Sequence, residues 1–315
     1  MAGRALSGPP SILADRALSG APSMLGLFAR AGVGMIPGAA KLPFVAGGGG
    51  EISGRALTLA DVPTDRVRLA AYDRVCGFDV SDVLPATYPH LLAFPLHLAL
   101  MTDASFPFAA IGLVHIANRI VSHRPIGAGE RLSIRVWATG TQPHPRGRQF
   151  AIHTEIRVGE ELVWEETSTN LKRGDGGGGG HGDGGGDPGP RSSAPPSTGG
   201  LPASATWRCP GDLGRRYAAV SGDFNPIHVH PLTARLFGFP GAIAHGMWTQ
   251  ARCLAALGSE LPSRFTVEAA FKRPIRLPAT VSFAEATAEE TIAFGVRDAQ
   301  RQTPHLDGAV YLPSG

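Results

Sequence analysis

A carboxylate and an imidazole lie five positions apart in the stretch 217–250, where Asp223 and His228 flank Asn225 and Pro226. An i, i+5 pair would lie on different faces of a helix, and Pro226 disfavours helical geometry at Asn225. The spacing therefore predicts a turn that bends both side chains toward one point. A carboxylate and an imidazole that converge in this way can hold a water molecule and remove its proton.

The elements that must position this pair are predicted around it. Residues 212–220 favour a short helix that leads into the turn. His245 and Gly246 open an apolar run to Leu257, which is the strongest helix prediction in the chain, and Gly258 is a plausible stop. Strands are predicted after it, at 264–271, 280–286 and 291–297.

The whole chain divides by composition into four segments. Residues 1–52 read as a flexible arm rich in Gly, Ala, Pro and Ser, and 173–203 as a Gly/Pro/Ser-rich disordered linker. Between them, 53–172 is expected to be one domain, with helices at 66–75 and 109–121 and strands at 131–138, 150–158 and 162–171. The remaining segment, 204–315, is the domain that carries Asp223 and His228.

The two domains share a short pattern, Tyr-x-x-Val-x-Gly, which begins at Tyr72 and again at Tyr217. Each half then has an apolar run around a histidine, His115 in the first and His245 in the second, followed by strand-like segments. The matched order indicates a duplication. At the offset of Asp223 the first half has Phe78, and at that of His228 it has Val83, so it has kept the scaffold and lost the polar pair.

Overall composition excludes several classes of protein. The formal net charge is +3 and no run of Lys or Arg of the nucleic-acid type occurs, so no nucleic-acid partner is expected. No apolar stretch reaches the length of a membrane span, and the N-terminus lacks the apolar core of a secretory signal. Three scattered cysteines form neither a disulfide framework nor a CxxC pair. These features favour a cytoplasmic protein.

The motif Tyr217-x-x-x-Ser221-Gly222-Asp223-x-Asn225-Pro226-x-His228, followed by Ile243-Ala244-His245-Gly246-Met247, resembles the hydratase signature of the MaoC-like (R)-specific enoyl-CoA hydratases. The first half, with residues 84–89 and 94–97, is similar to the degenerate half of double-hotdog members. The resemblance implies an α+β double hotdog, in which each half is a long helix wrapped by a curved antiparallel sheet. It also implies reversible hydration of trans-2-enoyl thioesters to (3R)-3-hydroxyacyl thioesters, with CoA or an acyl carrier protein as part of the substrate and no separate cofactor.

Carried over to this sequence, the resemblance implies that Asp223 and His228 share one water, with Asp223 as the proton acceptor and Asn225 in support. The thioester oxygen becomes negative as the enolate forms, and the backbone N–H of Gly246 at a helix N-terminus is the candidate oxyanion donor. Lys272 and Arg273 are candidates for binding the CoA phosphates.

Each role has a structural alternative. Asp223 could form only an Asx turn with Asn225. Gly246 could serve only close packing, His245 could be only a hydrogen-bond partner, and Lys272 with Arg273 only surface charge. A metal site at Asp223, His228 and His230 is not expected, because side chains at i, i+2 point apart in an extended chain and no cysteine joins them.

Two other functions remain open at this point. A hotdog thioesterase would use the acid to activate water at the carbonyl, and a non-catalytic acyl-thioester-binding subunit would use no acid at all. For the first half, a helix shifted or broken near Pro95 would make room for a longer acyl chain, and His115 reads as a satisfied core histidine. Chain length and the pairing of two chains into a homodimer are left undetermined by the sequence.

Overall fold

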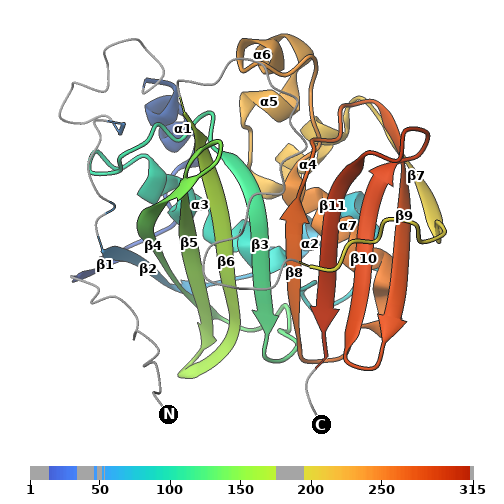
Figure 1. Ribbon diagram of the computed structural model, residues 1–315. Helices are drawn as coiled ribbons and strands as arrows, with labels where there is room; N and C mark the ends of the chain where they lie inside the picture. The colour runs from blue at the N-terminus through green and yellow to red at the C-terminus, as the bar shows by residue number, and fades with distance from the viewer. Residues whose placement is uncertain (1–13, 34–45, 48–51, 53, 175–194, 313–315) are drawn as a thin grey trace, which may run out of the picture.

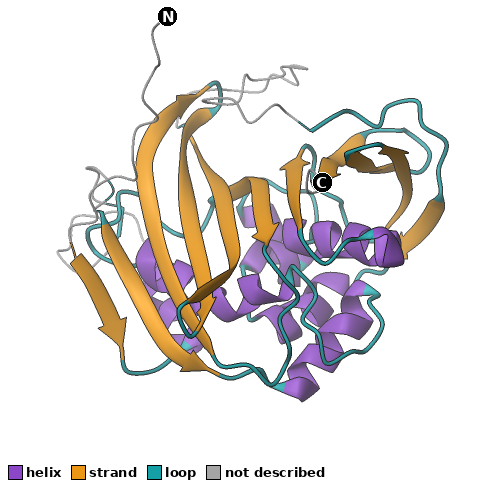
Figure 2. Ribbon diagram, turned by 90° about the horizontal axis from the view of Figure 1, so that it is seen from below, coloured by secondary structure: helices purple, strands orange, loops and turns teal. Residues whose placement is uncertain are grey.

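One curved sheet of eleven strands runs through the protein, in the order β1-β2-β4-β5-β6-β3-β8-β11-β10-β9-β7 (Figure 1). The computed structural model describes residues 14–33, 46–47, 52, 54–174 and 195–312. Neighbouring strands are antiparallel except for the parallel pair β1–β2. The sheet bends around the helices, which lie on its inner side (Figure 2).

The same order of elements occurs twice. The first half contains β2 (Arg55–Val62), α2 (Arg66–Cys76), α3 (Tyr88–Met101), β3 (Val114–Ser122), β4 (Leu132–His144), β5 (Gly147–Val158) and β6 (Glu161–Arg173), preceded by β1 (Ala14–Leu18) and α1 (Met24–Val33). The second contains β7 (Ala205–Cys209), α4 (Leu213–Ser221), the short α5 (Pro226–Val229) and α6 (Pro231–Leu236), α7 (Gly246–Leu257), η2 (Gly258–Glu260), β8 (Phe265–Phe271), β9 (Ala279–Ala288), β10 (Thr291–Asp298) and β11 (Pro304–Tyr311). The fold is a double hotdog, as the resemblance implied.

The two halves join along β3 and β8, which pair antiparallel from Ala117↔Ala270 to Ser122↔Phe265. Because this junction continues the ladder, the long helices α3 and α7 lie against one common sheet. Both helices are buried along their length, with Leu91 and Leu96 of α3 and Ala251 and Leu254 of α7 at most 1% exposed. A pocket between the halves is therefore walled by elements from both.

The repeated Tyr-x-x-Val-x-Gly pattern has a structural basis. Tyr72 and Tyr217 lie buried on α2 and α4, with ring centroids 6.2 Å apart. Each pattern ends in a glycine that caps its helix in the left-handed conformation, Gly77 at φ 83° and Gly222 at φ 81°. A residue with a Cβ rarely adopts that conformation, which explains why both copies keep glycine.

One predicted helix is wrong. Most of residues 109–121 form strand β3, and the long helix of the first half is α3, which begins earlier at Tyr88. β-Branched residues in 114–121 favour a strand, while Pro89 sits in the first turn of α3, where its missing N–H is tolerated. α3 also continues through Pro95, so the predicted break there is wrong too. The position that corresponds to His245 is the helix cap Thr87, not His115.

The other predicted helices and strands are confirmed, most of them within a few residues, although β4 continues to His144, beyond the predicted end at residue 138. Besides β3, four strands have no counterpart in the prediction, namely β1, β2, β7 and β11. Much of the predicted arm and of the glycine-rich linker lies outside the described residues. None of the helices in the described part of the chain has the length and apolar character needed to span a bilayer.

Candidate active site

The backbone bends sharply between Asp223 and His228. Asn225 is non-helical, with φ −53° and ψ 125°, and its side chain caps α5 by accepting the N–H of Ile227 at 3.4 Å. Oδ1 of Asp223 accepts the N–H of Asn225 at 3.1 Å, which is the Asx turn considered above. The predicted effect of Pro226 on Asn225 is confirmed, but His228 lies on the single turn of α5 that follows.

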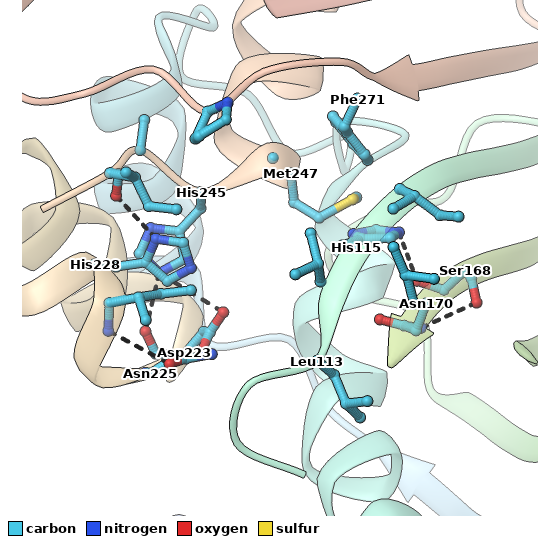
Figure 3. Close-up of a pocket in the computed structure, with 18 of the residues that line it drawn as sticks. Leu113, His115, Ser168, Asn170, Asp223, Asn225, His228, His245, Met247 and Phe271 are labelled. Atoms are coloured by element: carbon cyan, nitrogen blue, oxygen red, sulfur yellow. Dashed lines mark hydrogen bonds and ion pairs between the residues drawn. The ribbon is translucent and has the colours of Figure 1, made fainter. Parts of the chain in front are cut away.

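This bend brings Asp223 and His228 together with a third residue, His245. A nitrogen or oxygen atom from each lies within 4.8 Å of those of the other two. The two imidazoles stack with ring centroids 3.7 Å apart, and Nε2 of His245 lies 3.6 Å from Oδ2 of Asp223 and 3.0 Å from its backbone carbonyl oxygen. Figure 3 shows the three side chains gathered on one side of the pocket.

Backbone carbonyls determine which ring nitrogens carry hydrogen. The carbonyl oxygen of Ile243 can only accept, so Nδ1–H of His228 donates to it across 2.8 Å. In a neutral His228, Nε2 then carries a lone pair. Burial lowers the pKa of His228, with Asp223 opposing the shift, and burial lowers the pKa of His245 further. Both rings are therefore neutral at pH 7, and His228 offers an acceptor beside a carboxylate.

The N-terminus of α7 lies next to this cluster. His245 is the capping residue of the helix but makes no side-chain cap, and Gly246 is the first residue. A Cβ at Gly246 would lie 3.1–3.2 Å from ring atoms of Phe271. Close packing therefore favours glycine here, and the same absence of a side chain leaves the first backbone amides of α7 beside the pocket. The two explanations for Gly246 are compatible.

A cavity of about 220 Å³ connects these residues with the first half of the chain. All six predicted site residues line it, namely Asp223, Asn225, His228, Gly246, Lys272 and Arg273. The opposite wall in Figure 3 carries His115, whose Nε2 pairs with the Ser168 hydroxyl at 2.8 Å. This contact agrees with the prediction of a satisfied histidine, although the ring also faces the cavity.

Several lining residues were missed from the sequence. Arg146 and Arg173 of the first half line the same cavity as Lys272 and Arg273, which are exposed. Arg146 lies in the β4–β5 turn and Arg173 ends β6, so neither carried a motif. His90 and His97, seven residues apart on α3, also line the cavity. Their spacing of two helical turns was an available signal that they share one face.

Three further residues of this half make contacts of their own outside the cluster of Asp223, His228 and His245. His230 is exposed and caps α6 by accepting the N–H of Leu232 at 3.2 Å, so it does not join the polar cluster. The Thr249 hydroxyl lines the cavity but donates to the carbonyl oxygen of His245 at 3.2 Å. Cys253 is fully buried in α7, and burial raises the pKa of its thiol, as expected for a small core residue.

Gly214 in α4 allows the backbone of α5 to approach. A Cβ at this position would lie 1.9 Å from the carbonyl oxygen of His228. Alanine normally stabilises a helix interior relative to glycine, but here we expect Gly214→Ala to lower the free energy of unfolding by about 1–3 kcal/mol. Urea denaturation would measure the change. Gly241→Ala is the control, because a Cβ at Gly241 meets nothing within 4 Å; equal stabilities of the two variants would contradict the prediction.

Comparison with known proteins links this geometry to a family. Residues 206–308 match the family described as MaoC like domain. The chain is 34% identical over 260 residues to 3-hydroxyacyl-thioester dehydratase X of Mycobacterium tuberculosis, which covers 82% of this chain and 90% of that protein. The crystal structure of HtdX from the same organism superposes with a TM-score of 0.71, covering 81% of this chain and 99% of that one. This chain is also 36% identical over 73 residues to the (R)-specific enoyl-CoA hydratase of Aeromonas caviae. That match covers 23% of this chain and 54% of the hydratase.

Proposed function

The chain belongs to the MaoC-like dehydratase family, and from this premise we propose that it catalyses reversible hydration of trans-2-enoyl thioesters to (3R)-3-hydroxyacyl thioesters, a hydro-lyase reaction of fatty acid metabolism. One observation carries the proposal: the carboxylate of Asp223 and the imidazole of His228 lie close together in a cavity beside the first turn of α7. The relatives are named as a dehydratase and a hydratase, which supports the same reaction class.

The two groups suit a water molecule better than a substrate oxygen. Both Asp223 and the lone pair of His228 are acceptors, so a water between them donates one hydrogen to each. Its oxygen lone pairs then point away from both acceptors and toward the cavity. As this oxygen bonds to C3 of the enoyl thioester, Asp223 accepts a proton from it. The same proton then moves to C2, so hydroxyl and hydrogen add to the same face.

Negative charge develops on the thioester oxygen during this addition. In the proposed mechanism the N–H of Gly246, at the positive end of α7, donates to this oxygen. Water supplies every atom that is added and no electrons leave the substrate, so the reaction as proposed needs no separate cofactor. Asn225 supports the site through the two hydrogen bonds that hold the bend.

Lys272 and Arg273 are assigned to the phosphates of CoA or of an acyl carrier. They are exposed at the cavity, on the stretch after β8 where the N–H of Lys272 donates to the carbonyl oxygen of His305 at 2.9 Å. We expect the double variant Lys272→Ala, Arg273→Ala to raise KM for an enoyl-CoA about tenfold with little change in kcat. Steady-state kinetics at low and high salt would measure the effect, which should shrink as salt screens the charges.

The matched control is Arg276→Ala, which removes an exposed cation from the same segment but outside the cavity lining. It should leave KM unchanged. An unchanged KM in the double variant as well would remove the assignment of Lys272 and Arg273.

A single assay separates the proposed hydratase from the two alternatives. Crotonyl-CoA and a longer enoyl-CoA are followed by loss of the enoyl absorbance while free thiol is monitored. Hydration without thiol release is expected. Thiol release would instead indicate a thioesterase, and no reaction at any chain length would indicate a binding subunit.

The two halves of the chain have different roles in the proposed reaction. Residues 204–315 supply the reacting groups, and 53–172 supply the opposite wall. Since β3–β8 pairing already joins the halves, one chain contains both walls, and a homodimer is compatible with this arrangement but is not required by it. Cys76, Cys209 and Cys253 are buried free thiols, which suits a reducing compartment such as the cytoplasm.

A further inference from the structure

The first half of the chain, although it lacks counterparts of Asp223 and His228, contributes a second polar cluster to the cavity. His90 and His97 of α3 and Glu166 of β6 have a nitrogen or oxygen atom each within 4.8 Å of one another. Both histidines line the cavity together with His115 and Ser168. The surrounding lining is apolar and includes Leu91, Phe94, Leu98, Met101, Leu113 and Ile152. This polar cluster therefore lies among apolar side chains, apart from the cluster of Asp223 and His228.

We propose that His90, oriented by Glu166, is a hydrogen-bonding subsite for an oxygen substituent on the acyl chain of the substrate. The inference rests on the function proposed above and specifies its substrate class. The preferred substrates are thioesters whose acyl chain carries a hydroxyl, carbonyl or carboxylate oxygen, rather than thioesters with a plain alkyl chain.

Glu166 holds the ring of His90 in place. Its side chain is 0% exposed. Its two oxygens accept the Nδ1–H of His90, at 2.8 and 2.9 Å. Nδ2 of Asn118 donates to Oε1 of the same carboxylate at 2.6 Å. A buried carboxylate is stable only when it is paired and hydrogen-bonded in this way. The network fixes the orientation of the imidazole before any substrate arrives.

The Nε2 atom of His90 remains available for a ligand. The His90 side chain is 12% exposed and lines the cavity, while no described residue hydrogen-bonds its Nε2. The neighbouring histidines differ, because Nε2 of His97 pairs with the Thr154 hydroxyl at 2.7 Å and Nε2 of His115 with Ser168. Of the three Nε2 atoms, that of His90 is the one without a hydrogen bond from the described residues.

The Glu166 carboxylate favours the protonated form of His90, in which Nε2 is a hydrogen-bond donor. Burial alone would lower the pKa of His90, but the Glu166 carboxylate raises it above the ordinary value. Burial would likewise raise the pKa of Glu166, yet His90 holds it at about 2. His97 and His115 remain neutral, since burial lowers their pKa values to about 3 and about 4. Asp223 also raises the pKa of His90, so the reacting end and the subsite lie within electrostatic reach.

A plain alkyl chain in this cavity would cover the Nε2–H of His90 without pairing it. Leaving a charged donor buried and unpaired is unfavourable, whereas an oxygen on the chain would accept the hydrogen bond. We expect a discrimination of roughly tenfold to a hundredfold in favour of the oxygen-bearing chain. If the hydrogen bonds of His90 and Glu166 only held α3 against β6, an oxygen on the acyl chain would not change the affinity for the ligand.

The experiment measures binding of saturated thioesters, which cannot be hydrated, by calorimetry. Hexanoyl-, octanoyl- and decanoyl-CoA are compared with their ω-hydroxy and ω-carboxy counterparts. At the length that reaches His90, the oxygen-bearing ligand should bind at least about tenfold more tightly than the alkyl ligand. Equal or tighter binding of the alkyl ligand at every length would overturn the inference.

His90→Leu should abolish the preference, and the alkyl ligand should bind at least as tightly as before. The matched control is His123→Leu. His123 pairs at 2.7 Å with Glu165, the neighbour of Glu166 on β6, but lies outside the cavity lining. The control should keep the preference. An equal weakening of all ligands by His90→Leu would show a purely structural role and overturn the inference.

Glu166→Gln covers the case in which His90→Leu fails to fold. A glutamine oxygen still accepts Nδ1–H, but without the carboxylate His90 becomes neutral and Nε2 becomes an acceptor. The ω-carboxy preference should then disappear while the ω-hydroxy preference remains, and retention of both would overturn the inference.

Crotonyl-CoA hydration is measured on the same wild-type sample. Loss of chain preference with hydration intact rejects the subsite alone, and absence of hydration rejects the proposed function.

Discussion

Replacing Asp223 by asparagine should lower kcat for enoyl-CoA hydration about a thousandfold while leaving the fold intact. Oδ1 of Asp223 accepts the N–H of Asn225 at 3.1 Å, and an asparagine oxygen can accept the same bond, so the bend is kept. The other oxygen, 3.6 Å from Nε2 of His245, becomes an NH₂ group. An amide NH₂ donates hydrogen and cannot take a proton from water, so the variant loses the base and retains its support.

Enoyl absorbance and a thermal unfolding curve, recorded on the same sample, would test this prediction. Asp212→Asn is the matched control, because Asp212 is exposed ahead of α4 and lies outside the cavity lining. The control should retain wild-type turnover. Near-normal turnover in Asp223→Asn would mean that another group accepts the proton.

The second large effect is expected from His228→Ala, which should lower kcat about a hundredfold. The variant removes the Nε2 acceptor, so the water is held by Asp223 alone and is no longer oriented toward C3. His230→Ala is the control two residues further on. It removes the cap of α6 and should cost about 1 kcal/mol of stability with activity retained. Equal losses of activity in the two variants would contradict the assignment of His228.

The pH profile provides an independent measure of His228. Because burial lowers its pKa, the ring stays neutral until the pH falls below the ordinary value of about 6.5. Protonation then places a hydrogen on Nε2, and the activity of the wild type should fall. The unfolded chain takes up this proton first, so stability also decreases as the pH drops through this range. In His228→Ala the acid loss due to this ring should be absent.

Both predictions depend on residues close together in sequence, which is why they could be identified without a structure. A proline that excludes helix at Asn225 and the five-residue spacing of Asp223 and His228 are local restrictions on the backbone. The apolar run after Gly246, ended by Gly258, specified α7 in the same way. The glycines that end α2 and α4 were visible as a repeated pattern, since left-handed caps demand a particular residue.

The first half shows where such local reasoning fails. Residues 109–121 are apolar enough for a helix, and only pairing of β3 with β6 and β8 made this segment a strand. Apolar residues occur at neighbouring positions of this run, so the sequence lacks the strict alternation that would mark a strand, although burial in β3 does alternate from Asn118 to Ser122. Helix α3 was obscured by Pro95, whose cost is outweighed when neighbouring residues such as Leu91 and Leu96 are fully buried.

By itself, the sequence determined the proposed pair of Asp223 and His228, the turn between them, the helix beside it and the duplicated arrangement of the two halves. Tertiary structure alone decided that His245 stacks on His228, that Gly214 admits α5, and that Glu166 meets His90 across 76 residues of chain. Local motifs act through backbone dihedral angles, which neighbouring residues restrict directly. Contacts between distant residues depend on how the sheet curves and on which side chains share its inner face, and no short stretch of sequence contains that information.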